Sequence, residues 1–170
     1  MSELTEADVM TAEVRSWIGH DSEPMVLPEE IAAVDVRRYV EATGDRNPLW
    51  LDDDAARAAG YRARIVPPMM VVGLSWRLGD TGRLQHQVPL PEIYSDTRNA
   101  GLEIEWLEPV YVGDRLVLQH RITDITARSG RRGLGVYITR ETEYRRLGDD
   151  RAVARARQTT VRLPRSSKVQ

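Results

Sequence analysis

The sequence contains no cysteine and no phenylalanine, and its 170 residues include a single lysine, Lys168. The absence of cysteine excludes disulfide bonds and thiolate metal ligands, and it is typical of a protein kept in a reducing cytoplasm, where we expect this chain. No stretch approaches the roughly 20 apolar residues that a bilayer span requires. The acidic start, MSELTEADVM, also lacks the apolar segment of a secretory signal.

An excess of charge of one sign is lacking too, because 24 basic residues stand against 26 acidic ones for a net charge of −2. That balance gives no general attraction to nucleic acid or to an anionic membrane, and we expect neither as a partner. The hydrophobic fraction of 41% and the charged fraction of 29% are ordinary for a globular protein. A chain of this length fits one domain with a substantial core.

The first third of the chain is predicted to be largely helical. Val36, Tyr39 and Val40 follow the three-four spacing of one buried helix face, and Gly44 stands where that helix should end. We expect the stretch that follows, residues 45–51, to be irregular. Further short elements are predicted at residues 12–18 (helix), 25–27 (extended) and 52–59 (a helix opened by three aspartates).

A central helix is predicted where Pro67 and Pro68 open an apolar run that continues to Trp76. Proline is tolerated in the first turn of a helix. The run is apolar nearly all round, as a helix enclosed by a sheet would be. Residues 79–100 are rich in Gly, Pro, Asp and Asn, so we expect a long loop there.

The hydrophobic period then changes to two. Leu102, Ile104 and Trp106 alternate with glutamates, and similar alternation covers residues 115–121, 137–144 and 152–163, separated by glycine-containing turns. Helices followed by antiparallel strands predict an α+β domain whose sheet wraps around the central helix. The polar end of the chain, from Pro164, is expected to fray.

Three segments carry a resemblance to a known family. Residues 39–52, YVEATGDRNPLWLD, are similar to the signature G-D-x-N-P-[LI]-H-x-D of MaoC-like (R)-specific enoyl-CoA hydratases and dehydratases. Residues 65–70, IVPPMM, stand where that family begins its central helix with I-[VA]-H-G-M, and residues 107–114, LEPVYVGD, are similar to its P-V-x-x-G-D turn. The N-terminal MaoC-like (FAS1-like) dehydratase domain subfamily, which commonly has I-[VA]-P-P, resembles the chain more closely.

The resemblance implies a single hot-dog domain over residues 1–170, with residues 1–20 as an N-terminal extension and 164–170 as a frayed tail. It implies an acyl-CoA or acyl-carrier thioester as ligand, no cofactor, and either a homodimer or a heterodimer with a catalytic MaoC-like subunit. Asp45 occupies the position of a catalytic residue. The residues that would contact the thioester are Asn47, Trp50, Tyr61, Val66, Pro68 and Met69.

The chemistry of the family asks for more than this sequence offers. Hydration of an enoyl thioester needs a base for water, a proton donor and a donor to the oxyanion that develops on the carbonyl. Asp45 is kept, but the family histidine is replaced by Trp50, whose indole N–H donates and cannot accept a proton. The glycine whose amide would bind the oxyanion is replaced by Pro68, which has no N–H.

Each of these positions also has a purely structural interpretation. Asp45, Asn47 and Pro48 are ordinary turn residues, so Asp45 is expected to bond loop backbone rather than to act as a base. Trp50 either packs in the core or narrows the acyl pocket. The three histidines, His20, His86 and His120, have no metal-ligand spacing, and we expect no metal site.

Three functions remain open. The first is a non-catalytic or partly degenerate subunit of a heteromeric (R)-enoyl-CoA hydratase or 3-hydroxyacyl dehydratase, shaping the acyl-thioester pocket. The second is an active homodimeric hydratase or dehydratase that uses Asp45 with a donor such as Tyr61 or Ser75. The third is a hot-dog acyl-CoA thioesterase or an acyl-CoA-binding protein. The thioesterase needs a carboxylate on or near the central helix, and residues 68–79 contain none.

Overall fold

The computed structural model describes residues 4–78 and 83–165. Two short helices come first, α1 (Glu6–Val9) and α2 (Ala12–Ser16), followed by the two-residue strand β1 (Met25–Val26). Helix α2 confirms the helix predicted within residues 12–18, and β1 confirms the extended segment. Both short helices are capped by threonine, because Thr5 and Thr11 each accept a hydrogen bond from a first-turn backbone N–H.

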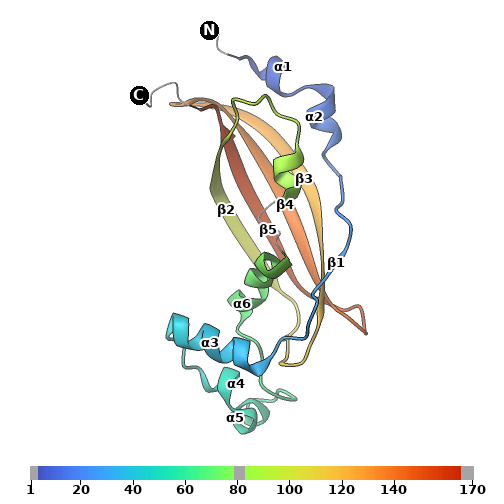
Figure 1. Cartoon of the computed structure of the whole chain (residues 1–170), viewed down its shortest axis with the longest axis vertical. Coiled ribbons are helices and arrows are strands. Elements are labelled where there is room, and N and C mark those ends of the chain that lie inside the picture. The colour runs from blue at the N-terminus through green and yellow to red at the C-terminus, as the bar shows by residue number, and fades with distance from the viewer. Residues whose placement is uncertain (1–3, 79–82, 166–170) are drawn as a thin grey trace.

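The three helices α3 (Ala33–Thr43), α4 (Pro48–Leu51) and α5 (Asp53–Ala58) gather at one end of the molecule (Figure 1). Helix α3 ends as predicted at Gly44, whose φ of 72° places it in the left-handed region that glycine tolerates best. The stretch that we expected to be irregular contains α4 instead. Asn47 caps that helix and Pro48 occupies its first position, two local signals that the turn-like composition concealed.

The central helix is shorter than its apolar run. Helix α6 (Pro68–Gly73) passes directly into a 3-10 helix at Leu74–Leu78. The predicted loop at 79–100 is wrong in part, because it contains α7 (Arg83–Gln87) and the start of strand β2 (Asp96–Trp106); residues 79–82 lie outside the described residues. Leu84 and Val88, one helical turn apart, are both buried, and their burial accounts for α7.

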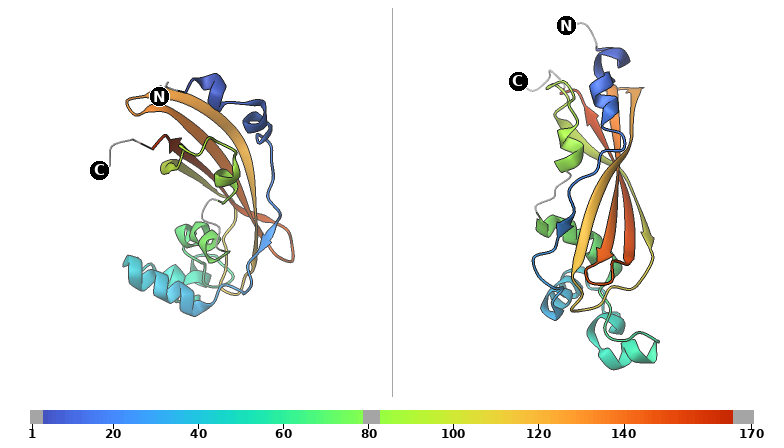
Figure 2. Two further views of the ribbon diagram at one scale, coloured as in Figure 1. Left: turned by 45° about the horizontal axis from the view of Figure 1, so that its top comes forward. Right: turned by 90° about the vertical axis from the view of Figure 1, so that its right-hand side faces the viewer.

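The sheet is antiparallel and consists of β1, β2, β3 (Leu116–Gly130), β4 (Gly133–Arg146) and β5 (Ala152–Leu163), in the order β1-β3-β4-β5-β2. Strands β3 and β4 form a hairpin that closes at Gly130 and Gly133, as the glycine positions predicted. The sheet curves around α6 and α7, which lie against its concave face (Figure 2). This arrangement confirms the predicted α+β class with a sheet wrapped around a helix.

We call the end of the sheet next to α3, α4 and α5 the helical end, and the end with the β3–β4 turn the hairpin end. Each has its own hydrophobic cluster. The core at the helical end includes Val36, Val40, Trp50, Met70 and Leu116. The core at the hairpin end includes Val9, Val14, Leu84, Tyr94 and Ile138, so α1 and α2 pack against the sheet.

A belt of buried polar side chains crosses the concave face between the two cores. His120 and Thr142 are each 2% exposed, and His120 Nδ1 lies 2.8 Å from Thr142 Oγ1. Arg140 is 6% exposed and donates to Gln158 Oε1 at 3.1 Å. Gln85 of α7 donates to the carbonyl of Ile138 at 3.0 Å. The belt joins α7 to the middle of the sheet through hydrogen bonds rather than apolar packing.

The two edges of the sheet differ. Backbone bonds tie the segment before α3 to the first half of β3, including Gly19 N to Ile122 O at 2.7 Å and Leu27 N to Leu116 O at 2.9 Å. Strand β2 pairs with β5 along one side, and its other side forms no backbone hydrogen bond with any described segment. An open edge eleven residues long is a ready site for pairing with another strand.

Candidate functional site

The residues of the first family motif form a compact, hydrogen-bonded turn between α3 and α4. Asp45 Oδ1 accepts from the backbone N–H of Asn47 at 3.2 Å, and Asn47 Oδ1 accepts from the N–H of Leu49 at 3.1 Å. The indole Nε1–H of Trp50 donates to Asp45 Oδ2 at 3.0 Å. Both carboxylate oxygens of Asp45 therefore have a donor, and one of these donors is the side chain at the family's histidine position.

Trp50 takes part in two structures at once. Its side chain is only 8% exposed and belongs to the core of the helical end, while its indole nitrogen reaches the exposed Asp45. An indole N–H can hold a carboxylate in place, but it has no lone pair with which to receive a proton from water. The Trp50–Asp45 hydrogen bond therefore stabilises the turn between α3 and α4, but the pair lacks the base that the Asp–His arrangement provides.

The second motif lies directly against the first. The N–H of Ile65 donates to the carbonyl of Leu49 at 3.2 Å, and the N–H of Val66 donates to Val110 at 2.7 Å. These bonds hold the segment before α6 between α4 and the third motif. Val66 is buried, Tyr61 packs against the same core, and Pro68 and Met69 face solvent, Met69 with 53% exposure.

The start of α6 is poor in donors for an oxyanion. Pro67 caps the helix without a side-chain hydrogen bond, and Pro68 at the first helical position has no amide hydrogen. Of the two substitute donors considered for an active enzyme, Ser75 is 5% exposed and donates to the carbonyl of Val72 at 3.2 Å. Its hydroxyl hydrogen is thus used within its own helix. Tyr61 is half-buried.

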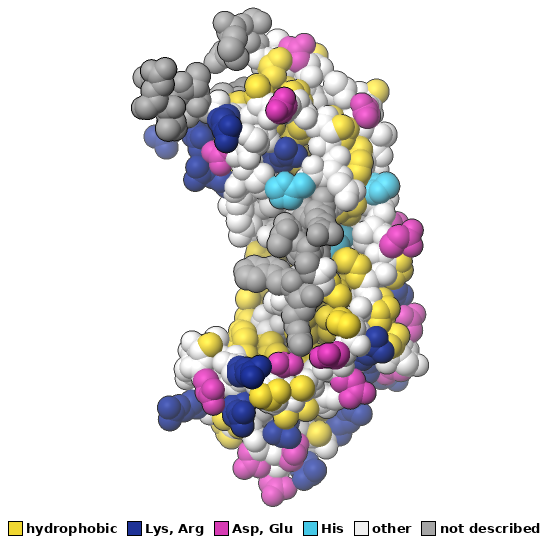
Figure 3. Space-filling view, in the orientation of Figure 1, with side chains coloured by type: hydrophobic (Ala, Val, Ile, Leu, Met, Phe, Trp, Pro, Cys, Tyr) yellow, Lys and Arg dark blue, Asp and Glu magenta, His cyan; other side chains and the backbone are white. Residues whose placement is uncertain are grey.

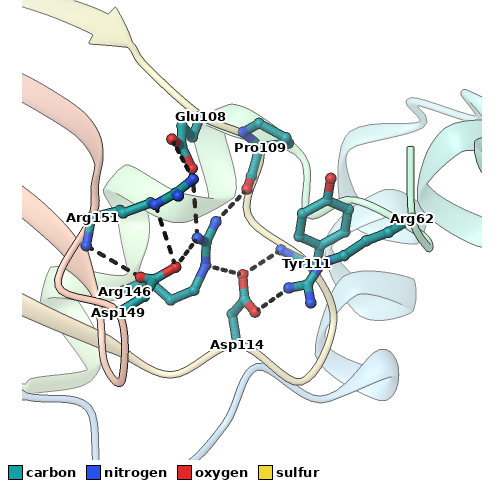
Figure 4. A network of polar contacts seen from close by, with 8 residues as sticks. All are labelled: Arg62, Glu108, Pro109, Tyr111, Asp114, Arg146, Asp149 and Arg151. Atoms are coloured by element: carbon teal, nitrogen blue, oxygen red, sulfur yellow. Dashed lines mark hydrogen bonds and ion pairs between the residues drawn. The ribbon is translucent and has the colours of Figure 1, made fainter. Parts of the chain in front are cut away.

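The third motif is pinned by an ion-pair network (Figure 4). Asp114, 9% exposed, accepts from Arg146 Nε at 3.0 Å, from Arg62 Nη2 at 2.9 Å and from the backbone N–H of Tyr111 at 2.9 Å. Arg62 also lies over the ring of Tyr111, 4.1 Å from its centroid. Asp114 thereby connects the strand–turn–strand motif to β4 and to the loop that leads into α6.

Arg146 extends the network to the β4–β5 turn. It donates to Asp149 at 2.9 Å and to the carbonyl of Pro109 at 3.0 Å. Burial alone would lower the pKa of Arg146, but the hydrogen bonds that it donates to Asp114 and Asp149 outweigh burial and raise its pKa above the usual value. Arg146 is therefore a fixed positive charge that holds the site scaffold together. Sequence reasoning missed this role, although the family turn ends at Asp114 itself.

The histidines lie apart from this site. His120 is in the buried polar belt, His86 is on α7, and the ring of His20 stacks on Trp17 with centroids 4.6 Å apart. Within residues 4–78 and 83–165 there is no group of three or more His, Cys, Asp or Glu side chains placed to hold a metal ion. In the same residues no helix is long and apolar enough to cross a bilayer.

A polar depression of about 290 Å³ lies on the opposite, convex face of the sheet. Its lining includes Gly101, Asp124, Tyr137, Thr159 and Arg157. None of the site residues predicted from the sequence lines it.

The comparisons with known proteins decide the family. The family described as "FAS1-like, dehydratase domain region" matches residues 16–155, most of the chain. The chain belongs to this FAS1-like dehydratase family. The match includes all three motifs and both the helical end and most of the sheet, so the resemblance read from the sequence is confirmed.

Curated relatives agree with this assignment to the FAS1-like dehydratase family. A UPF0336 protein of Saccharopolyspora erythraea is 35% identical over 116 residues, which cover 68% of this chain and 72% of that protein. The 3-oxo-4,17-pregnadiene-20-carboxyl-CoA hydratase alpha subunit of Mycobacterium tuberculosis is 35% identical over 65 residues, 38% of this chain and 21% of that subunit.

Solved structures show the same fold. The ChsH1–ChsH2 complex from Mycobacterium tuberculosis contains a chain that matches with a TM-score of 0.74 and 22% identity over 92% of this chain and 91% of that chain. The MaoC-like dehydratase from Rhodospirillum rubrum matches with a TM-score of 0.63 and 20% identity over 87% of this chain and 93% of that chain. The predicted hot-dog fold of this FAS1-like dehydratase family member is therefore confirmed.

Proposed function

We propose that this chain is the non-catalytic subunit of a heteromeric (R)-enoyl-CoA hydratase or 3-hydroxyacyl dehydratase, in which it shapes the acyl-thioester pocket. The observation that carries the proposal is the hydrogen bond from Trp50 Nε1 to Asp45 Oδ2 at 3.0 Å. It commits the one retained acidic residue to a donor that cannot move a proton. A partner subunit with an intact Asp–His pair would then supply the base and the oxyanion donor.

The names of two relatives support a subunit role. The hydratase of Mycobacterium tuberculosis matched above is an alpha subunit, and so is a probable enoyl-CoA hydratase alpha subunit of Thermomonospora curvata, 26% identical over 148 residues. The matched parts cover 21% and 45% of these subunits, so this chain spans less than half of their length. An alpha subunit implies at least one other kind of chain in the enzyme.

The open edge of the sheet supports a partner on physical grounds. On β2, Leu102 and Trp106 face the concave side and are each 43% exposed, while Ile104 between them packs against the core. Met69 at the start of α6 adds a further exposed apolar side chain. Burying such side chains and pairing the free backbone groups of β2 would both stabilise association.

Activity of the separated and combined chains tests the proposal. Purified alone, this chain should hydrate crotonyl-CoA and longer enoyl-CoA substrates no faster than the background rate, and co-expression with a MaoC-like subunit should give a complex that hydrates them. Asp45→Asn in this chain should change the rate of the complex by less than about twofold, whereas the matched substitution in the catalytic subunit should remove activity. Robust turnover by the isolated chain, lost in Asp45→Asn, would instead establish the active homodimer.

A second variant restores what is missing. In Trp50→His with Pro68→Gly, an imidazole faces Asp45 and an amide hydrogen returns to the start of α6. Such a double variant should show hydration above that of the parent chain if the fold accepts both changes, which circular dichroism and thermal unfolding would establish. Thiol release from a panel of acyl-CoA thioesters, followed with a thiol reagent, tests the thioesterase alternative and should show no release.

A further inference from the structure

The polar depression on the convex face follows one row of residues that crosses four strands. Asp124 of β3 pairs with Thr139 of β4. Thr139 pairs with Thr159 of β5, which in turn pairs with Gly101 of β2. Both ends of the row are irregular, because one bulge interrupts β3 between Ile122 and Asp124 and another interrupts β2 directly before Gly101. Bulges bend a strand, so the depression lies where two bends of the sheet coincide.

Neither the backbone nor the packing of this chain requires a glycine at Gly101, on the open edge of the sheet. The φ of Gly101 lies outside the left-handed region, and a Cβ added there would meet no atom within 4 Å. Glycine inside a strand weakens it and often marks a place where a ligand or another backbone approaches closely. The missing side chain thus leaves open space at the edge of β2 that this chain does not fill.

Two charged side chains that line the depression lack partners among the residues that the structure describes. Glu103 of β2 and Arg157 of β5 pair across the two strands, yet neither side chain forms an ion pair or a hydrogen bond with a described residue. One row nearer the helical end, Arg155 contacts Glu105 at 3.7 Å and Glu143 at 3.2 Å. The charges at the depression are therefore available to a second molecule, whereas those in the next row are already paired.

The depression reaches the sheet edge at which the proposed partner would pair. Its lining includes residues 100–103, the middle of β2. In Figure 3 the molecule is hollowed on the side of β2, between the hairpin end and the helical end, which leaves room for a second chain. In an antiparallel pair, opposite residues point to the same face with Cβ atoms about 5 Å apart. Whatever the register, the partner residue opposite Gly101 would therefore point to the convex face, beside the depression.

We propose that Gly101, Thr159, Glu103 and Arg157 form a socket for one long, neutral, polar side chain of the partner subunit's edge strand. This inference rests on the proposed function and names a feature that the partner must have. Because the two unpaired groups of the socket have opposite charges, the side chain needs both a donor for Glu103 and an acceptor for Arg157. Glutamine and tyrosine meet this requirement, and their length spans the space over Gly101.

The bulge in β2 gives the socket a role in the choice of partner. A bulge in an edge strand disturbs regular pairing and so discourages association with arbitrary strands. A partner whose side chain fills the space over Gly101 gains packing and hydrogen bonds at the same point. The edge of β2 therefore discriminates between strands through the socket as well as through backbone hydrogen bonds.

The test is a substitution series at Gly101, with the Kd for the co-expressed MaoC-like subunit measured by analytical ultracentrifugation. Gly101→Ala, Gly101→Val and Gly101→Leu fill the socket to an increasing degree. Gly101→Leu should raise the Kd about tenfold, and Glu103→Ala, which removes the acceptor, about fivefold. Because a Cβ at this position meets no atom of the chain, the Gly101 variants should fold with melting temperatures equal to or above that of the parent.

Thr126→Leu is the matched control. Thr126 lines the far end of the same depression on β3, about 14 Å from β2, so the Kd should change by less than about twofold. An unchanged Kd in Gly101→Leu, or an equal rise in Thr126→Leu, would overturn the socket. Turnover is measured separately, so a complex that Gly101→Leu weakens but that hydrates no enoyl-CoA would refute the proposed function and leave the socket standing. A chain that forms no complex with a MaoC-like subunit would refute both.

Discussion

The helical end and the hairpin end of the sheet are stabilised by different kinds of interaction. At the helical end, α3, α4 and α6 form one core with the sheet, and an ion-pair network around Asp114 and Arg146 connects the neighbouring loops. At the hairpin end, two short N-terminal helices and α7 form a second core with the sheet. The comparison shows that the end with the family motifs combines an apolar core with a partly buried ion-pair network, whereas the core of the hairpin end consists of apolar side chains.

The largest loss of stability is expected from the removal of Asp114 at the helical end. In Asp114→Ala, Arg146 keeps its buried position, with its side chain 13% exposed, and loses its principal carboxylate. We expect a loss of about 3 kcal/mol in the free energy of unfolding, measured by urea denaturation. Arg62→Ala removes the exposed partner of the same carboxylate and should cost less than about 1 kcal/mol. Equal effects of the two substitutions would show that the network is not organised around Asp114 and Arg146.

A matched pair of core substitutions asks whether the two ends unfold together. Val36 of α3 and Val14 of α2 are both 0% exposed, one in each core. Val36→Ala and Val14→Ala should each lower the free energy of unfolding by about 2 kcal/mol, because each deletes two buried methyl groups and leaves a cavity. A loss in Val36→Ala with none in Val14→Ala would show that the N-terminal helices separate from the sheet before global unfolding.

The Trp50–Asp45 bond can be removed with little change in shape. Trp50→Phe keeps an aromatic ring in the core and deletes the indole N–H, so we expect a loss of about 1 kcal/mol. Asp45→Ala, which leaves no side-chain acceptor for the indole, should cost a similar amount. In the double variant the two losses should not add fully, because both substitutions remove the same bond. Full additivity in urea denaturation would contradict a direct interaction.

The smallest effect concerns the covered edge of the sheet. A side-chain hydrogen bond from Arg121 lowers the pKa of Asp21 below its usual value of 3.8. A carboxyl with a lowered pKa contributes stability that is complete above the unfolded pKa and is lost as the pH falls below about 3.8, through the folded pKa. Asp21→Asn should therefore flatten the fall in melting temperature below pH 4 slightly. Parallel curves for parent and variant would refute this contribution.

Much of the fold could be predicted from the hydrophobic periodicity and from the positions of glycine and proline. Gly44 ended α3 as predicted, and the alternation at residues 152–163 matched β5 in full. Helix α7 was missed because Gly, Pro and Asp flank it on both sides and because only two of its apolar positions, Leu84 and Val88, mark the buried side. The alternation of Leu102, Ile104 and Trp106 predicted a strand correctly, but alternation cannot distinguish a covered strand from an open edge, and Leu102 and Trp106 proved exposed.

The candidate site was predictable in position and not in geometry. The motif identified Trp50 as the replacement for a histidine, but only coordinates place its indole nitrogen on Asp45. Similarly, the turn motif contains Asp114 without revealing that Arg146, 32 residues later, pairs with it.

The backbone bonds between the segment before α3 and β3 have a consequence for how large an assembly can grow. Because that segment forms backbone hydrogen bonds with the first half of β3, a strand of another chain cannot pair with that half. A chain with one open sheet edge and one covered edge is expected to form dimers and no longer assemblies. Removing the segment before α3 would expose the edge of β3, and chains with two open edges could then polymerise.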